Sequence, residues 1–212
     1  MRLRALLPHG LPGRVLLERE LGTFDELRPA IQSLLDSPRV GPPSLDIELG
    51  GMRITGRLAD LRGCGLFHLR LRKLQARDRI RFIIEHLAGS AAGVLPGEPS
   101  RLVTLDASHA LAPIDADVAR SLFTPWLDAF RQGLSRPIHF FPKSAFAFVE
   151  AKDRTRGLGA AERAWTGSER SRGECESPYY RKLFGGRVPI DKAFESVTTD
   201  LLVPVLGIMT RT

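Results

Sequence analysis

Metal-assisted hydrolysis of a phosphodiester is the chemistry that the carboxylates of the N-terminal third could support. The candidate metal ligands are Glu26, Asp46, Glu48 and Asp60. Hard oxygen ligands suit Mg²⁺, and two or three of them on adjacent elements can hold the ion against a scissile phosphate. Asp46 and Glu48 stand two residues apart, so in a strand they share one face. A metal-dependent nuclease is therefore one function that the sequence leaves open.

A small sheet and a helix are predicted around these acids. Alternation of apolar and polar residues predicts the strands, and Gly50-Gly51 predicts a hairpin turn between the first two. Apolar residues at helical spacing, from Ile80 to Leu87, predict a helix that packs on the sheet. The expected elements are strands Ser44–Leu49, Met52–Leu58, Leu66–Arg72 and Arg101–Leu105, all in one mixed sheet with the second beside the third, and a helix Gln75–Leu87 across it.

This order, α-β-β-β-α-β, resembles the core of the PD-(D/E)XK nucleases, but the acids of that class are missing. The resemblance puts Ala59 where the second strand should carry a metal ligand, and Asp60 is one residue late, which turns it to the opposite face. If Lys73 takes the position of the class lysine, Leu71 stands where the next ligand belongs. Residues 61–77 contain no Asp or Glu. We therefore expect a nuclease-like frame with no catalytic residue, no metal and no cofactor.

Basic residues concentrate in the same segment. Nine of the 31 Lys and Arg residues but only two of the 24 Asp and Glu residues lie between Arg53 and Arg81, so this segment carries as much net charge as the whole chain, +7. Such a local excess is what binding to a phosphate backbone requires, although a docking site for an acidic partner or a solvated face would look the same. The predicted DNA-binding or partner-binding residues are Arg53, Arg57, Arg70, Arg72, Lys73, Arg77 and Arg81.

The rest of the chain is predicted to be mainly helical. We expect residues 1–109 to form the nuclease-like core with N-terminal helices, and residues 110–212 to form a helical extension packed on it. Thr23 is the expected N-cap of the second N-terminal helix, and Asp36-Ser37-Pro38 its end. The further predicted helices are Val15–Glu20, Asp25–Leu35, Asp115–Gln132, a segment from Pro142 through Glu150, and Asp191–Met209 with a kink at Pro204.

Composition and missing motifs exclude several classes of protein. No run is apolar and long enough to span a bilayer, and no signal-peptide pattern is present, so we expect no membrane association. Cys64 and Cys175 form no disulfide framework, which is typical of a reducing cytoplasm. The chain has no GxxxxGK loop for ATP and no GxSxG elbow for a serine nucleophile.

Several short motifs, in order over nearly the whole chain, resemble the C-terminal domain of RecC, the gamma subunit of bacterial exodeoxyribonuclease V. The motifs are Leu6-Leu7-Pro8-His9-Gly10, Ile54-Thr55-Gly56-Arg57-Leu58, Gly65-Leu66, Lys73 to Arg79 running into Glu85-His86-Leu87, Phe140-Phe141-Pro142-Lys143-Ser144, Trp165-Thr166-Gly167, Gly173-Glu174 and Ser177-Pro178-Tyr179-Tyr180-Arg181. Their common order is more specific than any one of them.

The resemblance implies a PD-(D/E)XK-like fold that has lost catalysis. It also implies a place in a bacterial helicase-nuclease complex that processes double-strand breaks, with DNA and RecB-like and RecD-like subunits as partners. The subunit of that family is much longer, so we expect this chain to be part of a longer protein. Two functions stay open: a non-catalytic DNA-binding scaffold, and an active metal-dependent nuclease with relocated carboxylates.

Overall fold

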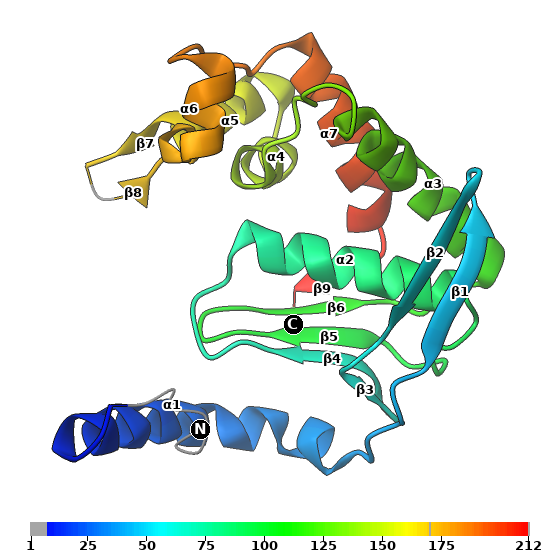
Figure 1. The fold of residues 1–212 in the computed structure, drawn as a ribbon, viewed down its shortest axis with the longest axis vertical. Coiled ribbons are helices and arrows are strands. Elements are labelled where there is room, and N and C mark those ends of the chain that lie inside the picture. The colour runs from blue at the N-terminus through cyan, green and yellow to red at the C-terminus, as the bar shows by residue number, and fades with distance from the viewer. Residues whose placement is uncertain (1–7, 170, 212) are drawn as a thin grey trace.

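The fold consists of a twisted sheet with a helix on each face and a layer of further helices beyond one of them. The computed structural model describes residues 8–169 and 171–211 (Figure 1). The helices are α1 (Leu11–Asp36), α2 (Ala76–Ala91), α3 (Ala116–Gly133), α4 (Pro142–Val149), α5 (Arg154–Thr166), α6 (Pro178–Phe184) and α7 (Lys192–Leu206), with a 3₁₀ turn at Glu174–Glu176. The strands are β1 (Ser44–Leu49), β2 (Met52–Arg57), β3 (Leu61–Arg62), β4 (Gly65–Leu69), β5 (Ser100–Val103), β6 (Ser108–Leu111), β7 (Gly167–Ser168), β8 (Ser171–Arg172) and β9 (Met209–Arg211).

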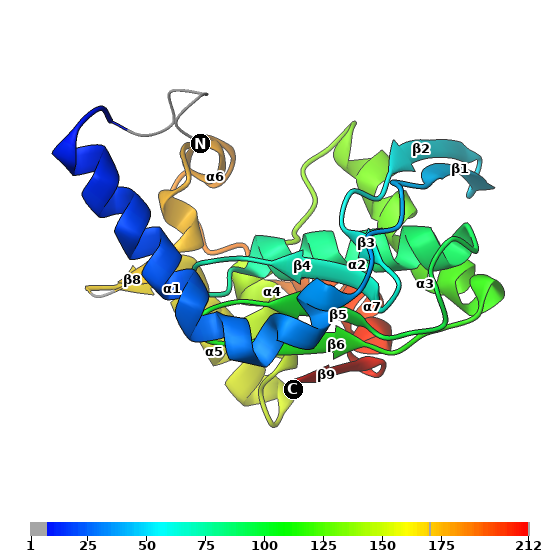
Figure 2. The same cartoon turned by 90° about the horizontal axis from the view of Figure 1, so that it is seen from below.

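The N-terminal segment is one helix, and the prediction of two helices was wrong. α1 runs through Thr23 without interruption, and the Thr23 hydroxyl donates to the carbonyl of Arg19 one turn back instead of capping a new helix. The expected end is confirmed, because α1 stops at Asp36 and Ser37 is extended. Figure 2 shows α1 lying across the strands, where Ile31 packs in a small cluster with Phe67 and Val103.

The predicted hairpin forms, but it lies outside the main sheet. β1 and β2 pair with each other only, so the expectation that residues 52–58 lie beside residues 66–72 was wrong. β2 ends at Arg57, the next residue, Leu58, lies in the core with 1% exposure, and a turn follows at 59–60. The chain then continues as β3, which pairs with β4 across a tight turn.

The main sheet has five strands in the order β3-β4-β5-β6-β9. β4 and β5 are parallel and are joined by α2, as the crossover in the predicted order requires, while the other pairs are antiparallel. The mixed α/β class is confirmed. β6 and β9 were not predicted: β6 runs across the expected boundary between residues 109 and 110, and β9 adds the end of the chain to the same sheet.

The core lies between the sheet, α2 and the C-terminal helices. α2 buries Phe82, Ile83 and Leu87 in this core, which confirms that the helix packs on the sheet as predicted. The predicted helices around residues 115–132 and 142–150 are confirmed as α3 and α4, and α7 covers most of the predicted last helix. The helices beyond α2 enclose aromatic rings around Phe141, including Trp165 at a centroid distance of 4.6 Å.

Candidate nucleic-acid interface

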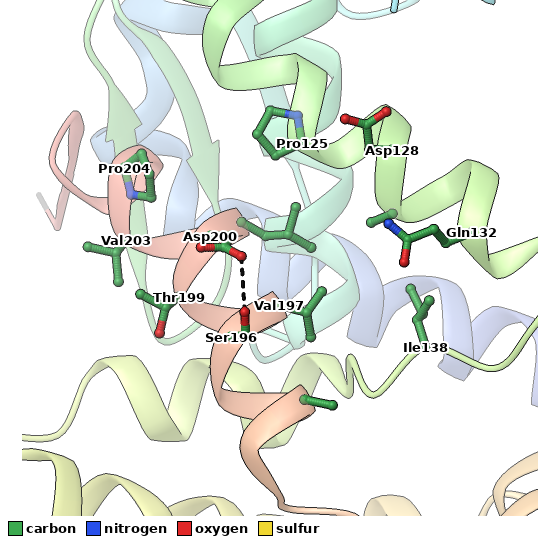
Figure 3. A pocket seen from close by; sticks show the side chains of 13 residues that line it. Pro125, Asp128, Gln132, Ile138, Ser196, Val197, Thr199, Asp200, Val203 and Pro204 are labelled. Atoms are coloured by element: carbon green, nitrogen blue, oxygen red, sulfur yellow. Dashed lines mark hydrogen bonds between the residues drawn. The ribbon is translucent and has the colours of Figure 1, made fainter.

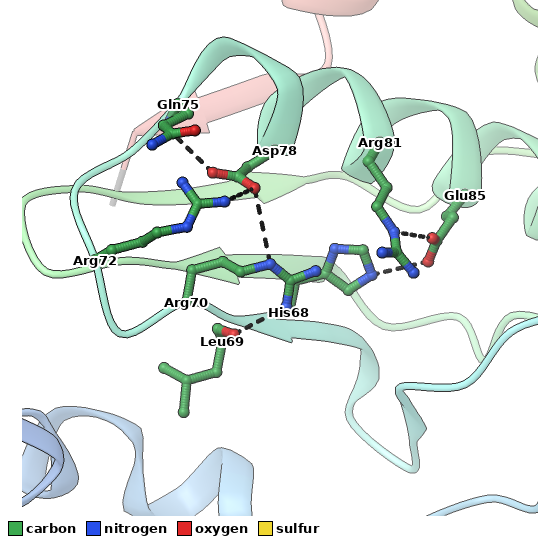
Figure 4. Close-up of polar contacts among 8 residues, drawn as sticks. All are labelled: His68, Leu69, Arg70, Arg72, Gln75, Asp78, Arg81 and Glu85. Atoms are coloured by element: carbon green, nitrogen blue, oxygen red, sulfur yellow. Dashed lines mark hydrogen bonds and ion pairs between the residues drawn. The ribbon is translucent and has the colours of Figure 1, made fainter. Parts of the chain in front are cut away.

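Four of the seven predicted basic residues meet at one surface pocket beside β4 and the first turns of α2. We call it the arginine pocket. Its lining residues are Asp60, Arg70, Arg72, Arg77, Asp78 and Arg81. The turn before β3 supplies Asp60, the segment after β4 supplies Arg70 and Arg72, and α2 supplies the other three. Figure 4 shows Arg70, Arg72, Asp78 and Arg81.

Strand alternation directs Arg70 and Arg72 to this side of the sheet. Phe67 and Leu69 point to the α1 face, where they join the cluster of Ile31. Residues 68, 70 and 72 therefore point to the α2 face, and each of them contacts a carboxylate of that helix. Arg77 and Arg81 lie one helical turn apart on α2, so both reach the same pocket.

Asp78 fixes the two arginines of the sheet. It belongs to the capping box that starts α2, in which its carboxylate accepts from the backbone of Gln75. The same carboxylate lies 2.6 Å from Arg72 Nη2 and 3.8 Å from Arg70 Nε, and the residue is 6% exposed. Arg72 Nη1 is buried and has no hydrogen-bond partner in the described part of the chain. Asp78 therefore binds only the Nη2 side of the Arg72 guanidinium, and Nη1 is left without a partner in the described residues.

A second network holds Arg81. Glu85 accepts from Arg81 Nε at 2.5 Å and lies 2.9 Å from Nε2 of His68, whose ring is 1% exposed. Burial alone would raise the pKa of Glu85, but the hydrogen bonds from His68 and Arg81 outweigh it and hold that pKa below its usual value. Glu85 therefore stays ionised and holds the guanidinium of Arg81 in place (Figure 4).

Arg77 is the arginine of the pocket that has no partner among the described residues. Its side chain is exposed and makes no ion pair or hydrogen bond within residues 8–169 and 171–211. The four guanidinium groups face three carboxylates, because Asp60 and Asp78 line the pocket and Glu85 binds Arg81, and Asp78 is shared by Arg70 and Arg72. The pocket therefore keeps an excess of positive charge with one free arginine, which suits it to an oxyanion such as a phosphate.

The other three predicted residues lie outside the pocket. Arg53 forms a two-pronged ion pair with Asp46 at 2.7 and 2.8 Å, which lowers the pKa of that carboxyl group. Arg57 is exposed on the same face of the hairpin, and Lys73 is exposed in the connection to α2. The two hairpin residues lie apart from the others because the hairpin of β1 and β2 is not part of the main sheet.

The carboxylates that could have held a metal ion do not come together. Asp46 is engaged by Arg53, Glu48 is exposed on the hairpin, Glu26 lies on α1 and Asp60 lies in the arginine pocket. The described residues contain no group of three or more His, Cys, Asp or Glu side chains arranged to hold a metal ion. The arrangement can bind an anion, and it offers no set of hard oxygen ligands around one point.

Sequence reasoning missed the acidic partners of the site. The Gln75-x-x-Asp78 spacing is a capping signature that could have identified Asp78. No signal in the sequence marked Glu85 as the partner of a buried His68. Two further basic residues of the segment are structural: Arg62 donates to the carbonyls of Leu35 and Ser37, and Arg79 pairs with Glu150.

A second surface pocket lies between α3 and α7 and is mostly apolar. Figure 3 shows Pro125, Ile138, Val197 and Pro204 on its walls, with Asp128 at its edge. Asp200 accepts a hydrogen bond from Ser196 within α7.

In the described part of the chain, no helix is both long and apolar enough to cross a membrane.

Comparison with known proteins identifies the family. The family described as the RecC C-terminal domain matches residues 1–153. The RecBCD enzyme subunit RecC of Escherichia coli (strain K12) is 25% identical over 202 residues, which cover 86% of this chain and 17% of that protein. The same subunit of Buchnera aphidicola subsp. Schizaphis graminum (strain Sg) is 22% identical over 194 residues, covering 85% and 18%. The chain thus spans less than a fifth of the length of these curated relatives.

Proposed function

The chain belongs to the family of RecC C-terminal domains, and from that premise we propose that it is a non-catalytic, nuclease-like domain that binds DNA and holds subunits together. Its setting is an exodeoxyribonuclease V complex with RecB-like and RecD-like partners, which acts in recombinational repair of double-strand breaks. Its core is of the PD-(D/E)XK type. The family membership supports the complex, and the arginine pocket supports the contact with DNA.

The observation that carries the proposal is the position of the arginine pocket. It lies where the turn at Asp60, the end of β4 and the start of α2 meet, which is the region where the resemblance to the nuclease class expects metal ligands. Guanidinium groups stand there instead. A fixed cation can bind a phosphate as a metal ion would, but it cannot activate water for hydrolysis as a bound metal does. The pocket therefore suits binding of a backbone without cleavage.

The test uses Arg77, because its removal leaves the carboxylate networks of the pocket intact. Arg77→Ala should weaken binding of the 212-residue chain to duplex and single-stranded DNA about equally for all sequences. The slope of log affinity against log salt concentration should fall by about one unit, because one phosphate contact is lost. Fluorescence anisotropy at several salt concentrations measures both quantities.

Arg187→Ala is the matched control, since it removes one exposed arginine in the loop after α6. It should leave the salt slope unchanged. An Arg77 variant that behaves like the control would count against a phosphate contact in the pocket. Charge reversal at Arg70 and Arg72 is a poorer test, because both side chains pair with Asp78 and their loss would disturb the start of α2.

Docking of an acidic partner subunit is the other use of the same charges. Arg77→Glu in the longer subunit should then reduce co-purification of the complex while DNA binding by this chain stays unchanged. If DNA binding falls and the complex still co-purifies, the pocket contacts DNA. The two measurements on one variant thus separate the two parts of the proposal.

An active nuclease with relocated carboxylates is the alternative, and the presence of Asp60 in the arginine pocket is the observation that favours it. Under our proposal, Mg²⁺ or Mn²⁺ does not promote cleavage of linear duplex or single strands by the purified chain. Metal-dependent cleavage that disappears in Asp60→Ala or Asp46→Ala would establish the alternative. Glu98→Ala is the control, because it removes an exposed acid in the loop before β5 that is not a candidate metal ligand.

A further inference from the structure

A separate pocket of about 580 Å³ lies under the first turns of α2, between the end of α4, the strand β6 and the edge strand β9. Its charged and polar lining residues are Arg79, Asp106, His109, Glu150 and Arg211. It shares no lining residue with the arginine pocket. The two sites can therefore be tested independently of each other.

His109 is a buried histidine of this pocket without a hydrogen-bond partner in the described part of the chain. The strand register places it directly opposite Leu102 on one side and Arg211 on the other, so its ring lies on the sheet face that α2 covers. The residue is 7% exposed, yet its ring nitrogens have no hydrogen-bond or ion-pair partner among residues 8–169 and 171–211. A buried imidazole normally has such a partner. The unused hydrogen-bonding capacity of His109 therefore points to a ligand in the pocket.

Arg211 supplies a free cation next to it. It is exposed at the end of β9 and forms no ion pair in the described part of the chain. Residues directly opposite in an antiparallel pair have their Cβ atoms about 5 Å apart. The guanidinium of Arg211 and the imidazole of His109 can therefore approach one small ligand from two sides.

The remaining charges of the pocket are already paired. Glu150 accepts from Arg79 Nη1 at 2.5 Å, and the Arg79 guanidinium lies 3.7 Å from the centre of the Phe146 ring. Asp106 accepts from the backbone of Leu74 at 2.8 Å and from the Thr104 hydroxyl at 3.1 Å. With these groups engaged, the groups left for a ligand are a cation and a hydrogen-bond donor.

We propose that this pocket binds a small tetrahedral oxyanion of the phosphate or sulfate type, held between the Arg211 guanidinium and the His109 imidazole. The proposal is independent of the DNA-binding function proposed above. A guanidinium donates to two oxygens of such an anion, and the imidazole donates to a third through its N–H group.

Binding of the anion is coupled to a proton on His109. Burial lowers the pKa of His109, and the nearby charges of Arg79 and Arg211 lower it further, while Glu150 acts in the opposite direction. An oxyanion beside the ring offsets the two arginines and raises this pKa. Each unit of that rise corresponds to about tenfold tighter binding at a pH below both pKa values than at a pH above them.

Sulfate is the probe, because its own charge does not change between pH 5 and 8. Titration of the 212-residue chain with sulfate, followed by NMR of the histidine ring signals, should shift the resonances of His109 and raise its pKa. Affinity should increase as the pH falls. Arg211→Ala should weaken sulfate binding by about tenfold or more, because a charge-assisted contact is lost.

Two variants and one control complete the test. His109→Gln should keep weak binding but lose its pH dependence. His109 is buried, so this variant could fail to fold. In that case the variant at the exposed Arg211 and the NMR titration of the unaltered chain still test the proposal. Arg77→Ala in the arginine pocket should leave sulfate binding at His109 unchanged. Sulfate that shifts no His109 resonance, or that binds equally well to Arg211→Ala, would overturn the proposal.

A short single-stranded oligonucleotide identifies the source of the anion. If the ligand is a nucleic-acid phosphate, Arg211→Ala weakens oligonucleotide binding as well as sulfate binding. If it is a free anion, only sulfate binding weakens. Both outcomes support the site and assign its ligand.

Discussion

His86 shows how a single side chain makes the stability of this fold depend on pH. It lies on the buried face of α2, 1% exposed, and its Nδ1 is 2.8 Å from the hydroxyl of Ser100 on β5. Burial lowers its pKa from the usual 6.5 to about 4. The ring is therefore neutral in the folded protein at a pH where the unfolded chain would already bind a proton.

The sign of the resulting pH dependence follows from proton linkage. Between pH 6.5 and about 4 the unfolded chain binds more protons at this residue, so the free energy of unfolding falls as the pH falls through that window. The contribution of His86 lost by pH 4.5 should be about 2 to 3 kcal/mol. Urea denaturation at pH 7.5, 6.0 and 4.5 measures it, and His86→Asn should show a slope reduced by about one proton.

His9→Asn is the control, because His9 is exposed. Its pH profile should match that of the unaltered chain. If His86→Asn also kept the full slope, protonation of other groups would account for the loss of stability at low pH.

At the scale of single residues, the sequence predicted which arginines lie together better than it predicted which acidic residues bind them. Alternation in a strand and one turn of a helix were enough to bring Arg70, Arg72, Arg77 and Arg81 together. The pairing of His68 with Glu85 was not predictable, because it depends on how far α2 sits above β4. That distance is set by packing and not by local spacing.

At the scale of elements, α4 and α5 illustrate packing that depends on one residue without a side chain. A Cβ atom added at Gly157 on α5 would lie 2.8 Å from the carbonyl oxygen of Phe148 on α4. Gly22 on α1 has no atom within 4 Å of the same position. Both glycines are in helices, but only Gly157 is needed for close helix contact.

Gly157→Ala and Gly22→Ala should therefore change stability in opposite directions. Gly157→Ala should lower the free energy of unfolding by about 1 to 3 kcal/mol, because α5 must shift away from α4. Gly22→Ala should raise it by about 0.5 to 1 kcal/mol, because alanine favours the helix at an open position. Denaturant titration of both variants measures the difference. A stabilising Gly157→Ala would mean that α5 is free to move.

The strands that the sequence failed to predict are short. β6 and β9 have four and three residues, too few for alternation to separate a strand from a loop. α2 and α3 have 16 and 18 residues, and their long apolar periodicity predicted them well. The end of β2 at Arg57 was missed for a different reason: the alternation of apolar residues continues through Leu58, so local pattern does not show where strand pairing stops.

At the scale of the whole molecule, the end of the chain completes a sheet that its first half begins. β9 pairs with β6 along residues 209–211, and on the other side of β6 the sheet continues through β5 to β4. Without β9, β6 would be an exposed edge strand. The same strand carries Arg211 to the position opposite His109.

The backbone pairing of β9 can be tested without removing side chains from the core. Ala112 N donates to Ile208 O at 3.0 Å, so alternation makes Ala110 and Thr210 the next hydrogen-bonded pair. Thr210→Pro removes the N–H group of that pair and should lower the free energy of unfolding by about 1 to 3 kcal/mol. Thr210→Ala keeps the N–H group, and because Thr210 is exposed it should change stability by less than about 0.5 kcal/mol. Denaturant titration of the two variants isolates the backbone contribution. Equal stabilities would mean that β9 does not hold the edge of the sheet, and that the first half of the chain closes its sheet without it.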